Sequence, residues 1–196
     1  MDDQDLTALV GSRICHDLIS PLSAIGNGLE LLQMSGGPES AEVELISNSL
    51  ESATARIRFF RIAFGDARPG QIISGHEVES ALRFAFKNTR LDLQIDARDM
   101  QRQTARFLFL SLQCLETAMA YGGQISAEFT EDKITLTGTA DRFAREDAVW
   151  DYLTSAMQSY ELRPAQVHFA LLRDHALQAG RSIRLSNTTT TLSLTV

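Results

Sequence analysis

The sequence predicts an α+β protein in which a pair of long N-terminal helices precedes a mixed helix-and-sheet domain. Helical periodicity runs through the first 64 residues. The segment GDARPG at 65–70 then interrupts it with glycine and proline. Beyond it, helical runs alternate with short strand-like runs, which is typical of helices packed on a sheet. We therefore divide the chain into a helical hairpin over 1–66 and an α/β domain over 71–196.

The composition narrows the class of protein. The chain has 196 residues, 44% of them hydrophobic, which is enough for one large domain or two small ones. Its net charge of −7 argues against nucleic-acid binding, which needs clustered Lys and Arg. Cys15 and Cys114 have no CxxC spacing and fit a reducing compartment. With no signal peptide and no membrane-length apolar run at the sequence level, we expect a cytoplasmic protein without membrane partners.

The first helix is predicted over 5–33 and has two opposed faces. At about 100° per residue, a polar stripe lies within roughly 40° of His16. It consists of His16, Ser20, Ser23, Asn27 and Glu30. The opposite, apolar stripe consists of Ile14, Leu18, Ile25, Leu29 and Leu32. GGP at 36–38 ends this helix and starts the next one, because Gly suits a helix C-terminus and Pro a first turn.

The second helix is predicted over 39–64, and its apolar residues alternate three and four apart. They are Val43, Ile46, Leu50, Ala53, Ile57, Phe60 and Phe64. This heptad spacing is typical of helix bundles. A lone antiparallel hairpin leaves much of its apolar surface exposed, so we expect two copies to pair as a homodimeric four-helix bundle.

The α/β domain is predicted element by element from its periodicity and turn residues. The expected elements are a strand at 71–74, a helix at 76–89, a strand at 91–96, a helix at 101–121, a hairpin of 124–130 with 133–139, a polar stretch with the packing residues Trp150 and Tyr152, a helix at 164–180, and a closing hairpin of 181–186 with 190–196.

His16 is the leading candidate for a reactive side chain. A histidine on a polar helix face is usually only solvated, but three features distinguish this one. Asp17 follows directly and can orient the imidazole, which raises the nucleophilicity of the other ring nitrogen. Pro21 removes a backbone N–H and bends the helix one turn later. The small polar stripe beyond His16 would let a partner protein approach closely.

The run HDLISPLSAI resembles the H-box of the dimerisation and histidine-phosphotransfer domain of two-component histidine kinases. His16, Asp17, Leu18, Pro21 and Leu22 match that pattern position by position. The resemblance implies that His16 carries phosphate as an N-phosphoimidazole and that Asp17 assists proton transfer.

The second region then resembles the ATPase domain of those kinases in its order of elements, but its nucleotide motifs are degenerate. Residues 104–121 contain none of the asparagines that hold magnesium and phosphate in that family. Asp141 lacks the glycines that follow the corresponding aspartate, and no glycine lies between Gly138 and Gly180. Since close backbone approach to phosphates depends on glycine, we expect no nucleotide site and no metal site here.

A phosphoacceptor hairpin joined to a degenerate ATPase-like domain resembles the ChpT-type histidine phosphotransferases. The resemblance implies a phosphorelay role, in which phosphate passes between receiver domains of a hybrid kinase and of response regulators. The receiver supplies the aspartate and Mg²⁺, so the chain needs no cofactor of its own. Besides catalytic His16 and Asp17, the residues we expect at the partner surface are Arg13, Ser20, Ser23, Asn27 and Arg56, with Arg58 and Arg61 as further basic contacts.

Two alternatives stay open at this point. A divergent histidine kinase would use ATP and would need a nucleotide site. A dimeric scaffold or inhibitor of two-component signalling would keep the bundle but carry no phosphate, so that replacing His16 would change at most its affinity for partners.

Overall fold

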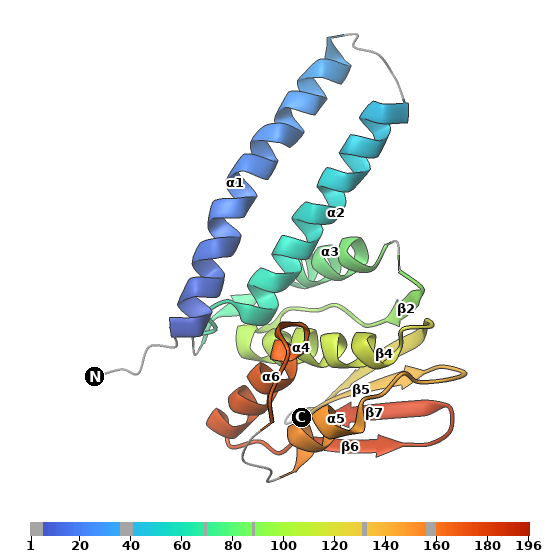
Figure 1. Cartoon of the computed structure of the whole chain (residues 1–196). Coiled ribbons are helices and arrows are strands. Elements are labelled where there is room, and N and C mark those ends of the chain that lie inside the picture. The colour runs from blue at the N-terminus through green and yellow to red at the C-terminus, as the bar shows by residue number, and fades with distance from the viewer. Residues whose placement is uncertain (1–5, 36–40, 69, 88, 131–132, 156–159) are drawn as a thin grey trace.

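A computed structural model describes residues 6–35, 41–68, 70–87, 89–130, 133–155 and 160–196. A long helical hairpin rises from an α/β domain, as Figure 1 shows. The predicted fold class, a helical hairpin followed by helices packed on a sheet, is therefore confirmed.

The hairpin consists of α1 (Leu6–Met34) and α2 (Ala41–Phe64), which lie side by side over most of their length (Figure 1). Pro21 lies inside α1, as expected. The two backbones come close near the base, where a Cβ on Gly11 would lie 3.2 Å from the carbonyl oxygen of Phe64. The predicted turn at 36–38 lies outside the described residues.

Helix α2 has a second apolar face that the heptad spacing did not reveal. Ala55, Phe59, Ile62 and Ala63 are buried. Phe59 lies 5.8 Å from the Phe86 ring and 4.7 Å from the Phe109 ring, between centroids. The end of α2 is held by Arg102, which donates to the carbonyl oxygens of Asp66 and Arg61 at 2.8 and 3.0 Å. The hairpin therefore shares the hydrophobic core of the α/β domain.

The main sheet has five strands in the order β2-β4-β5-β7-β6. Strand β2 pairs parallel with β4, and the other neighbours pair antiparallel. The strands are β2 (Leu91–Gln94), β4 (Gly123–Phe129), β5 (Ile134–Thr139), β6 (Arg184–Asn187) and β7 (Thr191–Thr195). Alternate residues such as Ile125, Leu136 and Leu194 are buried, which is the pattern of a sheet covered on one face.

The covering helices form a layer between the sheet and the hairpin (Figure 1). They are α3 (Gly75–Phe86), α4 (Arg102–Ala118) and α6 (Val167–Gln178), the last preceded by a 3₁₀ turn at Pro164–Gln166. Helix α4 is buried almost all round, from Ala105 to Leu115, because it packs on the sheet, on α2 and on α6.

Three elements differ from the sequence prediction. Residues Asp147–Thr154 form helix α5, where we expected only a polar stretch. Its buried residues Val149, Trp150 and Leu153 have helical spacing, but charged neighbours conceal the pattern in so short a segment. The predicted strand at 71–74 is reduced to β1 (Ile72–Ile73), which pairs with an unforeseen β3 (Met100–Gln101).

Candidate functional site

The polar stripe of α1 is exposed over its whole length. The His16 side chain has 81% of its surface accessible. Ser20, Ser23, Asn27 and Glu30 are exposed as well. Cys15, the neighbour of His16, is buried instead and its pKa is raised by that burial, as expected of a small core residue. The histidine is thus presented outward on α1, while its neighbour Cys15 faces inward.

His16, Asp17 and Arg13 form a hydrogen-bonded chain on the surface of α1. Nδ1 of His16 lies 3.1 Å from Oδ1 of Asp17. Arg13 donates from Nε to the other carboxylate oxygen, Oδ2, at 2.8 Å. The hydrogen bond with His16 is the main cause that lowers the pKa of Asp17, and the bond and charge of Arg13 lower it further. Asp17 therefore stays ionised and occupies one ring nitrogen of His16, which leaves Nε2 on the solvent side.

A groove of about 580 Å³ adjoins this stripe, between α1, α2 and α3. Ser23 and Asn27 line it from α1, Arg58 from α2, and Phe84 from α3. The polar stripe and the outer surface of α3 therefore border the same concave surface, so a protein seated against the stripe in this groove would also reach the α/β domain.

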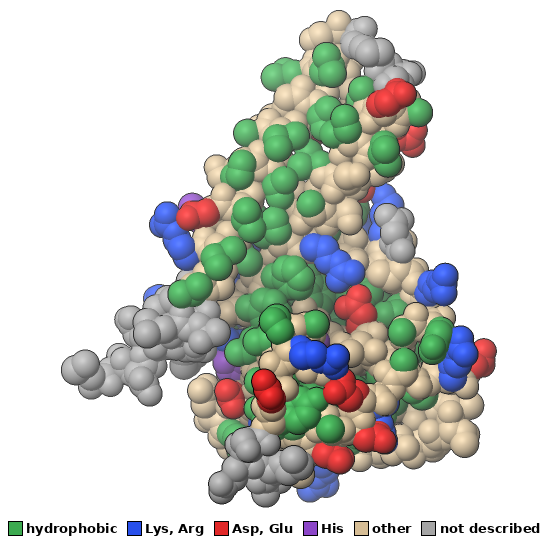
Figure 2. Space-filling model, viewed as in Figure 1, with side chains coloured by type: hydrophobic (Ala, Val, Ile, Leu, Met, Phe, Trp, Pro, Cys, Tyr) green, Lys and Arg blue, Asp and Glu red, His purple; other side chains and the backbone are tan. Residues whose placement is uncertain are grey.

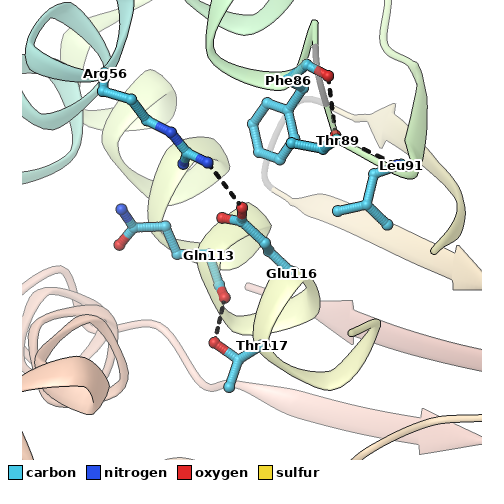
Figure 3. Close-up of polar contacts among 7 residues, drawn as sticks. All are labelled: Arg56, Phe86, Thr89, Leu91, Gln113, Glu116 and Thr117. Carbon is cyan, nitrogen blue, oxygen red and sulfur yellow. Dashed lines mark hydrogen bonds and ion pairs between the residues drawn. The ribbon is translucent and has the colours of Figure 1, made fainter. Parts of the chain in front are cut away.

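The other predicted basic contacts lie apart from the histidine. Figure 3 shows Arg56 pointing to α4, where Nη2 lies 3.3 Å from Oε1 of Glu116. Arg61 donates to Glu77 of α3 at 2.7 Å. Both arginines thus bridge the hairpin to the α/β domain, and the structure does not bring Arg56 to the His16 stripe.

Helices α4 and α6 are packed against each other. The Thr117 hydroxyl donates to the carbonyl oxygen of Gln113 at 2.9 Å (Figure 3). Nε2 of His168, on α6, lies 3.2 Å from that hydroxyl oxygen and is positioned to donate to it. The next residue, Phe169, packs edge-on against Trp150 with ring centroids 5.2 Å apart. Burial lowers the pKa of His168 to about 4, so it is neutral in this contact at physiological pH.

Two features are absent from the described residues, a metal-binding cluster and a membrane-spanning helix. Among those residues, no three His, Cys, Asp or Glu side chains come together in a way that could hold a metal ion. None of the helices in this part of the chain combines the length and apolar character needed to span a membrane.

Comparison with known families decides the affiliation of the chain. The family profile described as the histidine phosphotransferase C-terminal domain matches residues 75–191, more than half of the sequence. The chain belongs to the histidine phosphotransferase family. The resemblance to ChpT-type histidine phosphotransferases is thereby confirmed.

Two individual relatives agree with this assignment, and a kinase domain superposes more loosely. It is 59% identical over 88 residues to the protein phosphotransferase ChpT of Brucella abortus (strain 2308), a segment that makes up 44% of this chain and 41% of the relative. A solved bacterial phosphotransferase superposes with a TM-score of 0.67 and 25% identity, covering 100% of this chain and 97% of that one. The histidine kinase domain of a blue-light activated kinase from Erythrobacter litoralis superposes with a TM-score of 0.44 and 14% identity, covering 96% and 91% of the two chains.

Proposed function

We propose that this histidine phosphotransferase carries a phosphoryl group on His16 and passes it between the aspartates of receiver domains, without using ATP. The observation that carries this proposal is the exposed imidazole whose Nδ1 lies 3.1 Å from Asp17 while Nε2 is left free. Family membership and the H-box-like run support it.

The chemistry assigned to this pair is an in-line displacement. Asp17 accepts a hydrogen bond from Nδ1–H, so the proton stays on Nδ1 and the lone pair is on Nε2. Nε2 attacks phosphorus, an N–P bond forms, and the bond from phosphorus to the receiver's aspartyl oxygen breaks, the carboxylate leaving with the electron pair. Asp17 stabilises the positive charge that develops on the ring. The reverse reaction loads the next receiver.

The chain would contribute positioning, and the receiver would contribute the metal. Phosphoryl transfer depends mainly on alignment and charge neutralisation, and the Mg²⁺ that neutralises the phosphoryl oxygens would come with the receiver. The expected docking residues Ser20, Ser23 and Asn27 are small, exposed and in line with His16, and the last two line the groove. This arrangement supports a receiver seated on α1 against α3.

Independence from ATP is supported by the packing between α4 and α6. His168 and Phe169 are buried against Thr117 and Trp150. A nucleotide bound between α4 and α6 would have to displace these side chains and expose apolar surface. A titration with ATP and Mg²⁺, followed by the fluorescence of Trp150, should give no change; saturable binding would favour the divergent-kinase alternative.

A homodimeric bundle is supported by the apolar stripe opposite His16. Val10, Ile14, Leu18, Ile25 and Leu32 of α1 are all about half exposed or more in the single chain. Figure 2 shows hydrophobic side chains gathered along this face of the hairpin. A monomer seldom exposes so long an apolar patch. We expect light scattering to give twice the mass of one chain, and Ile25→Glu to yield monomers that keep their helicity.

The experiment that tests the carrier role is transfer from a phosphorylated receiver domain in the absence of ATP. Label should pass to the wild-type protein, be labile in acid and stable in base, and be absent from His16→Ala. Label on both proteins would assign the role to another histidine. No label on either, across several receivers of the same genome, would favour the scaffold alternative.

A further inference from the structure

We propose that Arg13 is a positioning residue that acts through Asp17: it fixes the carboxylate so that the His16 proton stays on Nδ1 and Nε2 remains free. This inference rests on the proposed function, because it assigns the reactive nitrogen of the same histidine. It differs from the expectation at the sequence level, which placed Arg13 against the phosphate or the receiver.

The two oxygens of the Asp17 carboxylate have different partners. Oδ1 faces Nδ1 of His16 at 3.1 Å, and Oδ2 accepts from Nε of Arg13 at 2.8 Å. A carboxylate held at one oxygen alone can rotate about its terminal torsion, which is broad and poorly restricted. With Arg13 on Oδ2, rotation would break a charge-assisted hydrogen bond, so Oδ1 is kept against the ring.

The geometry of α1 itself brings the side chains of Arg13 and Asp17 together. Arg13 and Asp17 are four residues apart on α1, a separation at which side chains of opposite charge meet on one face. His16 is adjacent to Asp17 in sequence and would otherwise turn freely, since its side chain is 81% exposed. Arg13 therefore restricts the orientation of the Asp17 carboxylate, and the carboxylate in turn restricts the orientation of the His16 ring.

The consequence concerns which tautomer of His16 is present. Neutral imidazole in water places its proton mainly on Nε2, and in that form Nε2 has no lone pair with which to attack phosphorus. The hydrogen bond to Asp17 reverses the preference. Loss of Arg13 loosens Asp17, returns part of the population to the Nε2–H form, and lowers the fraction of molecules ready to react.

The effect should be catalytic and not structural. Exposed ion pairs contribute little to stability, and Arg13 is 76% exposed. Arg68 offers a matched control, because its Nε donates to Asp66 at 2.7 Å and its side chain is 77% exposed, but no histidine adjoins that carboxylate in sequence. Arg68→Ala should therefore lose an equivalent ion pair without changing His16.

The decisive measurement is the tautomer of His16 in the full-length protein, read from ring ¹⁵N shifts by NMR at mildly alkaline pH. His16→Ala identifies the His16 signals by their loss. We expect wild type and Arg68→Ala to hold the proton on Nδ1, Arg13→Ala to shift toward Nε2–H, and Arg13→Lys, which can still reach Asp17, to lie between them. Transfer from a phosphorylated receiver should slow about 2- to 5-fold in Arg13→Ala, the factor that an exposed charge pair of this kind commonly represents.

The outcomes separate this proposal from the proposed function. The tautomer is measured without any receiver, so it can be altered by Arg13→Ala even if no phosphate is ever transferred. An Arg13→Ala protein with the wild-type tautomer overturns the positioning role, and slowed transfer in that protein would instead assign Arg13 to direct contact with the receiver. Equal slowing in Arg68→Ala would also overturn it.

Discussion

Replacing His168 tests whether the contact between α4 and α6 holds this histidine neutral in the folded protein. His168 is 7% exposed, and its Nε2 lies 3.2 Å from the Thr117 hydroxyl oxygen. Burial lowers its pKa from 6.5 to about 4. The unfolded chain therefore binds a proton between these two pH values that the folded protein does not, so stability is full above pH 6.5 and is lost as the pH falls toward 4.

The size of the effect follows from that difference in pKa. At about 1.4 kcal/mol for each pH unit, the whole shift corresponds to about 3 kcal/mol, of which about 2 kcal/mol is already lost at pH ~5. His168→Gln keeps a donor for Thr117 but has no proton to gain. The free energy of unfolding of the variant should therefore depend less steeply on pH over this range, by about 2 kcal/mol between pH ~7 and ~5.

Urea unfolding followed by the fluorescence of Trp150 provides the assay, because Trp150 is the single tryptophan and packs on Phe169 next to His168. Wild type and His168→Gln are compared at one protomer concentration, since dimerisation would add to stability. If both proteins lose the same free energy of unfolding between the two pH values, His168 is not held neutral by burial in the folded state, which would refute this reasoning.

Three other substitutions test the fold. Gly123 has φ +138°, and a Cβ there would lie 2.4 Å from the carbonyl oxygen of Thr139, so Gly123→Ala should lower the urea midpoint by the equivalent of about 1–3 kcal/mol or more, whereas an unchanged midpoint would contradict this backbone. Phe59→Ala should cost about 3–5 kcal/mol in calorimetry because it empties the core shared by the hairpin and the α/β domain; a cost near zero would mean that the two are not packed together. Arg102→Leu removes both donors from the end of α2 and should cost about 1.5–3 kcal/mol in urea unfolding, with earlier hydrogen exchange at the end of that helix; protection equal to wild type would contradict the cap.

Much of the fold could be predicted from periodicity, because the hairpin helices are long and amphipathic and the strand pairs of the sheet are separated by recognisable turns. Helix α5 was not predicted because its eight residues make too few helical turns to show a repeating hydrophobic pattern. The pairing of β1 with β3 was not predicted because each strand has only two residues and the paired residues, Ile73 and Met100, lie 27 positions apart in the sequence. Such contacts depend on tertiary packing and leave almost no local signal.

Some contacts of the candidate site could also be predicted from the sequence, and others could not. His16 and Asp17 are neighbours in sequence, so their contact was foreseeable, and the spacing of four from Arg13 to Asp17 was a signal that could have been interpreted as an ion pair. Arg56 could not be placed in advance, because its partner Glu116 is 60 residues away on another element. The second apolar face of α2 could not be predicted either, because its residues lie between the heptad positions.

The double role of α2 determines how the polypeptide could be divided experimentally. A fragment ending at residue 66 would leave Phe59, Ile62 and Ala63 in contact with water. A fragment starting at residue 71 would lack the helix α2 that covers one side of its hydrophobic core. Each would lose the burial of large apolar side chains that contribute about 1.5–3 kcal/mol apiece. The two pieces should therefore behave as complementary fragments that recover native structure when mixed, and not as modules that can be transplanted separately.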